Sequence, residues 1–386
     1  MFPLPDPARD LLEKWASGLQ PTAADCDSLI ALELADRDRA RAFGIDASNC
    51  GDRLRARARA FAADLNAVKP LIEQLGLPLE RVLDYLWWVW LPLVERIASE
   101  RVQFGRPLVW GILGLQGTGK TTLAILCRAL LARRGKRALG LSIDDLYKTY
   151  AERQQLQQAD PRLVYRGPPG THDIPLGIDL LDRIRAGAKP LTVTRFDKSA
   201  CNGAGDRATP ERVFEAIDIL LFEGWFVGVP PLPENTFTNP SLPLPIVSPA
   251  DRQFARDTNA RLRDYLPLWQ RLDRLLVLYP QDYRLSKRWR REAEAQRIAT
   301  GGAGMNPDAV DRFVDYFWRA LHPELFVAPL LKTPSIADLV VEVLPDRSPG
   351  RVYSPKGSCG SRSRSETVST GLTVTEVSPP SDRKFE

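Results

Sequence analysis

The sequence predicts an α/β fold, in which helices flank a mainly parallel sheet and a helical extension precedes it. Three observations lead to this prediction. From about residue 105, apolar runs typical of strands alternate with segments of helical periodicity, a pattern that predicts a parallel sheet covered by helices. One strand-to-helix junction is a glycine-rich turn over 114–121. The first hundred residues show only the three- and four-residue apolar spacing of helices.

Composition sets the expected boundaries and excludes some partners. We expect a helical extension over 1–100, an α/β domain over 101–345 and a disordered tail over 346–386, because the last segment is mainly Ser, Thr, Gly, Pro and Arg. The 386 residues carry a net charge of +5, from 53 basic and 48 acidic side chains. Bulk charge therefore gives no case for binding nucleic acid or a membrane.

The N-terminal segments are predicted to be structural. Helical spacing occurs over 11–15, 29–42, 54–68 and 71–75. The most hydrophobic stretch, 82–94, contains Asp84 and Pro92 and is too short to cross a bilayer. We expect it to form a buried helix whose tryptophans, Trp87, Trp88 and Trp90, pack against the α/β domain.

Five scattered cysteines show no C-x-x-C spacing, which argues against a zinc site and a disulfide framework. Reduced thiols in the cytoplasm are the expectation. The first residues show no basic stretch followed by an apolar core, so we expect no secretory signal.

The α/β domain is expected to contain six strands and the helices between them. Strands are predicted over 108–115, 138–143, 191–196, 217–222, 274–279 and 338–344, and helices over 123–134, 176–186, 283–300 and 307–321. The proline-rich segment 228–249 is expected to be a surface loop. Ligands of such a sheet bind beyond the carboxyl ends of its strands.

The glycine-rich turn has the sequence GLQGTGKTT over 114–122, which matches the phosphate-binding P-loop in its required place between a strand and a helix. Main-chain N–H groups of Gly114, Gly117, Thr118 and Gly119 would face phosphate oxygens, aided by the helix N-terminus at Lys120, Thr121 and Thr122. Lys120 could reach the β- and γ-phosphates, and the Thr121 hydroxyl could bind Mg²⁺. The alternative is a glycine-rich turn without a ligand.

Two strands end in acidic residues that could complete such a site. Asp144 follows the strand 138–143 and could accept the proton of an attacking hydroxyl; alternatively, Asp144 or Asp145 only caps the next turn. Glu223 follows an apolar strand and could hold Mg²⁺ or position the acceptor. A solvated acid at a strand end is the alternative for Glu223.

Two polar loops and one basic helix are further candidates. The loop 166–173 holds Arg166, His172 and Asp173, and the loop 197–207 holds Asp197, Lys198 and Arg207. We expect them to contact a small polar anion, with Lys198 or Arg207 on a carboxylate and Asp197 accepting from a hydroxyl. The run 284–292 could close over phosphates as a lid through the residues Arg284, Arg288 and Arg291, although such runs are usually solvated helix faces.

These motifs together resemble a known kinase superfamily. SIDDLY over 142–147 is similar to the signature of the phosphoribulokinase, uridine kinase and pantothenate kinase superfamily, whose catalytic aspartate falls on Asp144. GLQGTGKTT, SIDDLYKT (142–149), YRGPPGTHD (165–173), FDKSACNGAGDR (196–207) and FEGWFVG (222–228) resemble more closely the plant-type D-glycerate 3-kinase family. The resemblance covers about 105–332, leaving the N-terminal hundred residues and the tail outside.

The resemblance implies a P-loop kinase that uses ATP and Mg²⁺ to phosphorylate D-glycerate at its 3-hydroxyl. A related kinase acting on uridine, ribulose 5-phosphate or pantothenate is an open alternative. An NTP-driven regulatory switch is a second alternative, against which the sequence offers no N/T-K-x-D guanine signature.

Overall fold

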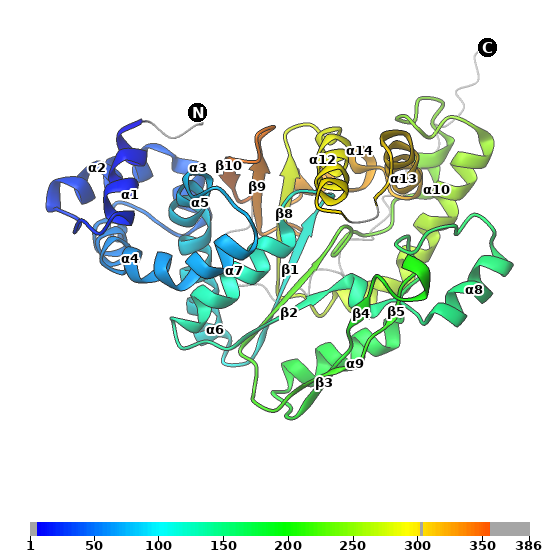
Figure 1. Ribbon diagram of the computed structural model, residues 1–386, viewed down its shortest axis with the longest axis horizontal. Coiled ribbons are helices and arrows are strands. Elements are labelled where there is room, and N and C mark those ends of the chain that lie inside the picture. Colours follow the sequence, from blue (N-terminus) through cyan, green and yellow to red (C-terminus); the bar gives the residue numbers. More distant parts are fainter. Residues whose placement is uncertain (1–5, 302–303, 356–386) are drawn as a thin grey trace, which may run out of the picture.

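The computed structural model describes residues 6–301 and 304–355 (Figure 1). Its helices are α1 (Asp6–Ala16), α2 (Ala23–Ala35), α3 (Arg37–Ala42), α4 (Cys50–Gln74), α5 (Leu79–Tyr85), α6 (Leu91–Phe104), α7 (Lys120–Ala132), α8 (Tyr150–Ala159), α9 (Ile174–Arg185), α10 (Pro249–Arg261), α11 (Leu266–Trp269), α12 (Leu285–Ala299), α13 (Pro307–Ala320) and α14 (Pro323–Phe326). Its strands are β1 (Leu108–Gly114), β2 (Ala138–Ser142), β3 (Leu191–Val193), β4 (Phe196–Asp197), β5 (Asp206–Arg207), β6 (Glu211–Val213), β7 (Ile219–Gly224), β8 (Arg274–Pro280), β9 (Leu339–Val343) and β10 (Pro349–Tyr353).

The central sheet has six strands in the order β10-β9-β8-β1-β7-β2. All neighbours pair in parallel except β9 with β10. β1 and β7 are buried along their whole length, as expected for parallel strands covered on both faces. The predicted α/β fold with a mainly parallel sheet flanked by helices is therefore confirmed.

The two faces of the sheet belong to different hydrophobic cores. On β1, Trp110 and Ile112 join the core formed with the N-terminal helices and α7, whereas Val109 and Leu113 join the core formed with α9, α10 and α13. Side chains alternate between the faces of a strand, so β1 anchors both layers. Figure 1 shows the N-terminal helices, in blue, beside the sheet rather than as a detached body.

The tryptophan-rich segment is buried, as predicted. It forms α5, a π-helical turn over Leu86–Trp90 and α6. Trp87 and Trp88 are almost completely buried, and Trp87 packs edge-on against Trp15 of α1 at 5.5 Å between ring centroids. The segment thus joins the first helices to the sheet.

Two predictions about strands are wrong. Segment 191–196 does not enter the central sheet; it forms β3 and β4, each in its own two-stranded ribbon with β6 or β5. Thr192 is exposed between two buried neighbours, so only one face of β3 is covered. Residues 349–353, expected in the tail, form β10 and extend the sheet, because Val352 is buried there. The remaining expected tail, 356–386, lies outside the described residues.

Four of the five cysteines lie in the described part of the chain. Cys26, Cys50, Cys127 and Cys201 are free, and Cys359 lies outside the described part. Within 6–301 and 304–355, no helix combines the length and apolar character needed to span a membrane.

Candidate active site

The glycine-rich turn joins the end of β1 to the start of α7. Gly117 and Gly119 adopt φ angles of 78° and 85°, in the left-handed region that L side chains avoid. A Cβ on Gly114 would lie 2.5 Å from the Thr118 hydroxyl oxygen, which itself donates to the Leu115 carbonyl at 2.8 Å. The glycines therefore allow a tight turn at the helix N-terminus, as an anion cradle requires.

Lys120 folds back over this turn. Its Nζ donates to the Leu115 carbonyl at 3.0 Å. Burial lowers the pKa of Lys120, and the charges of Glu223 and Asp144 oppose that shift. The ammonium group is thus within electrostatic range of both acidic candidates. Thr122 follows in the first turn of α7.

Glu223 lies beside the turn because β7 is the neighbour of β1, with Ile112 opposite Glu223 in the register. Its carboxylate accepts a hydrogen bond from the Thr121 hydroxyl at 3.0 Å. A hydroxyl and a carboxylate oxygen are the ligands that Mg²⁺ prefers. Among the described residues no three His, Cys, Asp or Glu side chains cluster for a metal, but Mg²⁺ bound with phosphates needs only one or two protein ligands.

Asp144 lies in a 3₁₀ turn, Ile143–Leu146, directly after β2. Its carboxylate forms an ion pair with Lys198 at 2.6 Å. Burial alone would raise the pKa of Asp144, but the charge of Lys198 and hydrogen bonds from Lys198 and Tyr147 outweigh it and lower the pKa. Asp144 is therefore charged at neutral pH.

The neighbouring acid, Asp145, has the capping role that was the alternative for Asp144. Its carboxylate accepts from the Ser142 amide at 3.0 Å and from Arg195 at 3.0 Å. Since Asp145 closes the turn, the side chain of Asp144 is available for other contacts.

His172 is buried beside Tyr147. Its ring stacks on Tyr147 at 4.6 Å, and Nδ1 shares a hydrogen bond with the Tyr265 hydroxyl at 2.7 Å. Burial lowers the pKa of His172 to about 3, so the imidazole is neutral. The structure places it where it supports Tyr147, and Nε2 has no hydrogen-bond partner in the described part of the chain.

The remaining loop candidates pair with groups of the two loops themselves, mostly from one loop to the other. Arg207 donates to Asp173 at 2.7 Å, and Asp173 also caps α9. Asp197 accepts from the Ser199 amide and hydroxyl. Arg166 donates to the carbonyl of Gly203 at 2.8 Å. Lys198 is thus the loop candidate that the structure brings into contact with Asp144.

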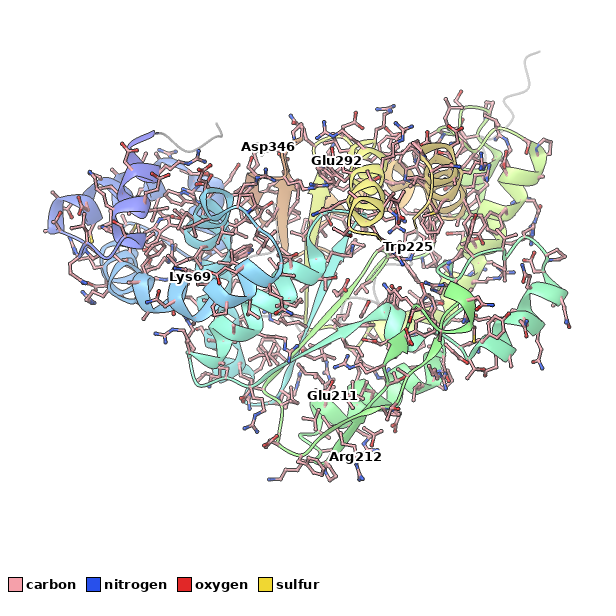
Figure 2. All side chains as sticks on the ribbon, in the orientation of Figure 1. Lys69, Glu211, Arg212, Trp225, Glu292 and Asp346 are labelled. Carbon is pink, nitrogen blue, oxygen red and sulfur yellow. The ribbon has the colours of Figure 1, made fainter. Side chains whose placement is uncertain are left out.

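The loop 166–173 is also tied to the sheet and to α13. Trp225, labelled in Figure 2, follows β7 and donates from its indole nitrogen to the Gly167 carbonyl at 3.2 Å. A Cβ on Gly167 would lie 2.3 Å from the ring of Phe317. This close approach fixes the loop next to the strand that carries Glu223.

The basic helix α12 packs on the P-loop, but with side chains other than those predicted. A Cβ on Gly117 would lie 2.7 Å from the Cβ of Trp289. The predicted lid arginines pair elsewhere: Arg284 with Asp282, Arg288 with Glu292, labelled in Figure 2, and Arg291 with Asp311.

Arg290 is a further basic residue of α12 that the sequence analysis did not single out. It pairs with Glu294, and its buried Nε has no partner among the described residues. Burial lowers the pKa of Arg290, the charge of Glu294 opposes that shift, and the positive charges of Arg297 and Arg166 add to it.

The chain is similar to known kinases, although no protein-family model matches it. Chloroplastic D-glycerate 3-kinase of Arabidopsis thaliana is 32% identical over 308 residues, which are 74% of this chain and 63% of that protein. An uncharacterized kinase, mug58, of Schizosaccharomyces pombe is 31% identical over 226 residues, which are 55% of this chain and 79% of that protein. The solved D-glycerate 3-kinase of Cryptococcus neoformans superposes with a TM-score of 0.60 at 27% identity, over 68% of this chain and 96% of that one. The chain thus spans less than two thirds of the length of the plant enzyme.

Proposed function

The chain belongs to the family of P-loop kinases that includes D-glycerate 3-kinase, and on that premise we propose that it transfers the γ-phosphoryl group of ATP to the 3-hydroxyl of D-glycerate, giving 3-phosphoglycerate and ADP. The observation that supports this best is the 2.6 Å ion pair between Lys198 and Asp144. This pair consists of an ionised carboxylate and a cation from the FDKS loop. Both lie within electrostatic range of Lys120, because the charges of both residues influence its pKa.

The nucleotide side of the proposed site is the P-loop. Main-chain N–H groups of 114–119 and the N-terminus of α7 would surround the phosphates. Lys120 would leave the Leu115 carbonyl to reach the β- and γ-phosphates. Thr121 and Glu223, 3.0 Å apart, would hold Mg²⁺, which in such kinases neutralises charge on the phosphates.

The acceptor side is centred on Asp144. The hydroxyl oxygen of the acceptor would form a bond to the γ-phosphorus as the bond to the β–γ bridging oxygen breaks. The hydroxyl proton would pass to the carboxylate of Asp144, which is ionised because its pKa is lowered despite burial. Because the transition state of phosphoryl transfer is loose, Asp144 would contribute mainly by orienting the attacking hydroxyl.

The carboxylate of the acceptor needs a cation. Lys198 is exposed over 63% of its side chain and can exchange Asp144 for a substrate carboxylate. Arg207 is proposed to support this carboxylate contact indirectly, because its own guanidinium group already forms an ion pair with Asp173. Arg290 is added to the proposal as a further cation, because its buried Nε has no hydrogen-bond partner in the described part of the chain.

The acceptor is tested by an assay of ADP formation with ATP, Mg²⁺ and a panel of D-glycerate, uridine, ribulose 5-phosphate and pantothenate. We expect turnover with D-glycerate alone. Turnover with another compound of the panel would identify that compound as the acceptor instead of D-glycerate. ATP hydrolysis that none of the four compounds changes would favour the regulatory switch.

The carboxylate contact is tested by a matched pair on α12. Arg290→Ala should raise KM for D-glycerate about tenfold through loss of a charge-assisted hydrogen bond, with a smaller change in KM for ATP. Arg291→Ala removes the same charge from the neighbouring position, where it pairs with Asp311, and should leave KM for D-glycerate unchanged. Equal effects of the two variants would rule out a specific role for Arg290.

A cytoplasmic location and the absence of nucleic acid and membrane partners remain part of the proposal. The name of the Arabidopsis relative places that protein in the chloroplast. Fractionation of the source cells would test the location.

A further inference from the structure

The loop between β9 and β10, residues 344–348, is attached to α12. The two strands pair as an antiparallel hairpin, and we call this segment the hairpin loop. The carbonyl of Pro345 accepts hydrogen bonds from the Arg288 guanidinium group and, at 3.4 Å, from the indole nitrogen of Trp289. Two consecutive side chains of α12 thus meet one carbonyl group of the loop, which holds the two elements together.

Arg347 makes a second connection from the hairpin loop to α12. Its guanidinium group pairs with Glu292 at 2.8 Å, and its central carbon lies 5.6 Å from the centre of the Trp289 ring; Figure 2 labels Glu292 and Asp346, the loop residue next to Arg347. The φ angle of Arg347 is 67°, in the left-handed region that glycine adopts without cost and L side chains avoid. An arginine at such a position points to a role of its side chain.

α13 holds α12 along a neighbouring stripe of the helix. Lys287 pairs with Asp315 at 2.7 Å, and Arg291 pairs with Asp311. Successive residues of a helix are about 100° apart around its axis, so this stripe lies next to the one that contacts the hairpin loop. Contacts on both stripes limit the rotation of α12 about its axis.

Trp289 extends these contacts to the P-loop. The residue is only 1% exposed. The three atoms nearest to a Cβ on Gly117 would be the Cβ, Cε3 and Cγ of Trp289, at 2.7, 3.3 and 3.5 Å. The indole therefore lies against the main chain of the P-loop at a residue whose φ angle is 78°. A movement of Trp289 would change the space available to Gly117, and thereby the direction of the N–H groups that would face phosphate oxygens.

We propose that Trp289 is a positioning residue for ATP: held by the hairpin loop, it keeps the P-loop at Gly117 in the conformation that binds phosphate. The inference rests on the proposed function only for the premise that the P-loop binds ATP, and it does not depend on the acceptor. A cradle that already has its bound shape loses less conformational freedom when the ligand binds, which strengthens binding. Trp289 acts through the main chain of the turn rather than by touching the nucleotide.

The test is calorimetric titration of the full chain with a non-hydrolysable ATP analogue and Mg²⁺, without acceptor. Trp289→Ala should weaken binding at least about tenfold, because the P-loop is no longer held. Trp289→Phe keeps an aromatic ring against Gly117 and should restore most of the affinity. Trp15→Ala removes another almost completely buried indole, from α1 where it packs on Trp87, and should lower stability without changing the affinity.

The outcomes separate this inference from the proposed function. Absence of binding in the wild type would overturn the premise that the P-loop binds ATP, and the proposed function with it. If the wild type binds, an unchanged affinity in Trp289→Ala, or equal losses in Trp289→Ala and Trp15→Ala, would contradict the positioning role alone. Tighter binding by Trp289→Ala would also contradict it, because the indole would then obstruct the P-loop instead of shaping it.

The hairpin loop is tested by Arg347→Gly, which removes the side chain without straining the loop. Glycine adopts a φ of 67° without cost, so urea unfolding should show little loss of stability. The affinity for the ATP analogue should fall about threefold, through loss of a partly exposed ion pair and of the contact with Trp289. A loss of stability with unchanged affinity would show that Arg347 only supports the fold.

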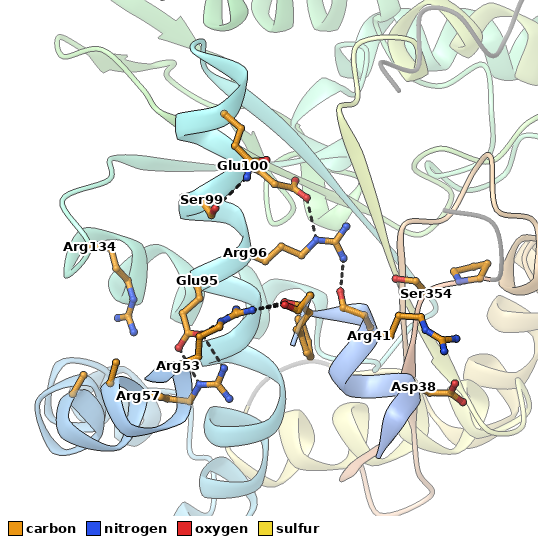
Figure 3. A pocket seen from close by; sticks show the side chains of 17 residues that line it. Asp38, Arg41, Arg53, Arg57, Glu95, Arg96, Ser99, Glu100, Arg134 and Ser354 are labelled. Atoms are coloured by element: carbon orange, nitrogen blue, oxygen red, sulfur yellow. Dashed lines mark hydrogen bonds and ion pairs between the residues drawn. The ribbon is translucent and has the colours of Figure 1, made fainter. Parts of the chain in front are cut away.

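Arg351→Gly is the matched control on the same hairpin. Arg351, on β10, pairs with Glu342 and with Asp38 of α3. Asp38, labelled in Figure 3, lines a cavity of about 1120 Å³ between α3, α4 and α6. Among the described residues that line this cavity, none belongs to the P-loop, α12 or the hairpin loop. Arg351→Gly should therefore leave the affinity for the ATP analogue unchanged, and equal affinities of Arg347→Gly and Arg351→Gly would contradict the role of the hairpin loop.

Discussion

The two sides of the candidate active site are built from different groups. On the nucleotide side, main-chain N–H groups within a single turn form the cradle, and glycines at φ of 78° and 85° give it its shape. On the acceptor side, charged side chains from several loops are paired with one another, as Lys198 is with Asp144 and Arg207 with Asp173. The nucleotide side should therefore respond mainly to changes in backbone conformation, and the acceptor side mainly to changes in charge and pH.

The largest effect is expected at Asp144. Asp144→Asn keeps the shape of the side chain but removes its charge and basicity, so kcat should fall by about 10²–10⁴-fold. The dissociation constant for ATP should change little, because the P-loop is untouched. Steady-state kinetics and nucleotide titration measure the two quantities. The matched control is Asp145→Asn, which weakens a turn through its bond to the Ser142 amide; a larger loss of kcat there would contradict the proposed role of Asp144.

The nucleotide side is tested by Gly117→Ala. The new Cβ would occupy a left-handed conformation that costs about 1–2 kcal/mol, and it would lie 2.7 Å from the Cβ of Trp289. ATP should bind more than about tenfold more weakly. Gly135→Ala carries the same kind of conformational cost at a φ of 65°, in open space after α7, and should spare ATP binding. An unchanged affinity of Gly117→Ala for ATP would show that the contact between the turn and α12 does not affect nucleotide binding.

This difference between the two sides also explains what the sequence predicts well. A local pattern determines the P-loop, and the strand ends at Asp144 and Glu223 follow from the order of apolar runs. Arg284 and Arg288 pair with acids that are close in the sequence, Asp282 and Glu292. Arg291 instead pairs with Asp311 of α13, and no local pattern fixes how α12 and α13 pack. β10 was missed because its buried residue, Val352, lies within a polar composition.

A moderate effect, dependent on pH, is expected at Lys198. Lys198→Ala removes the cation that lowers the pKa of Asp144, so that pKa should rise. Activity requires the ionised carboxylate, and the acidic limb of the kcat/KM profile should therefore move to higher pH. At neutral pH the loss of one charge-assisted contact should cost about tenfold in kcat/KM. Lys148→Ala, a nearby charge without an ion pair to Asp144, is the control. An unshifted acidic limb would show that Lys198 does not set the ionisation of Asp144.

The smallest effect is expected in the stability conferred by His172. The folded-state pKa of about 3 lies below the usual value of about 6.5, so the unfolded chain binds the proton more readily. Stability should be complete above about pH 6.5 and should decrease as the pH falls towards 3, with a loss of about 1.4 kcal/mol by about pH 5.5. Urea unfolding of the wild type and of His172→Phe at about pH 7.5 and 5.5 isolates this contribution, because other groups titrate in both proteins. The wild type should lose more stability between the two conditions than the variant; equal losses would show that the imidazole ring is not held neutral against Tyr147 and Tyr265.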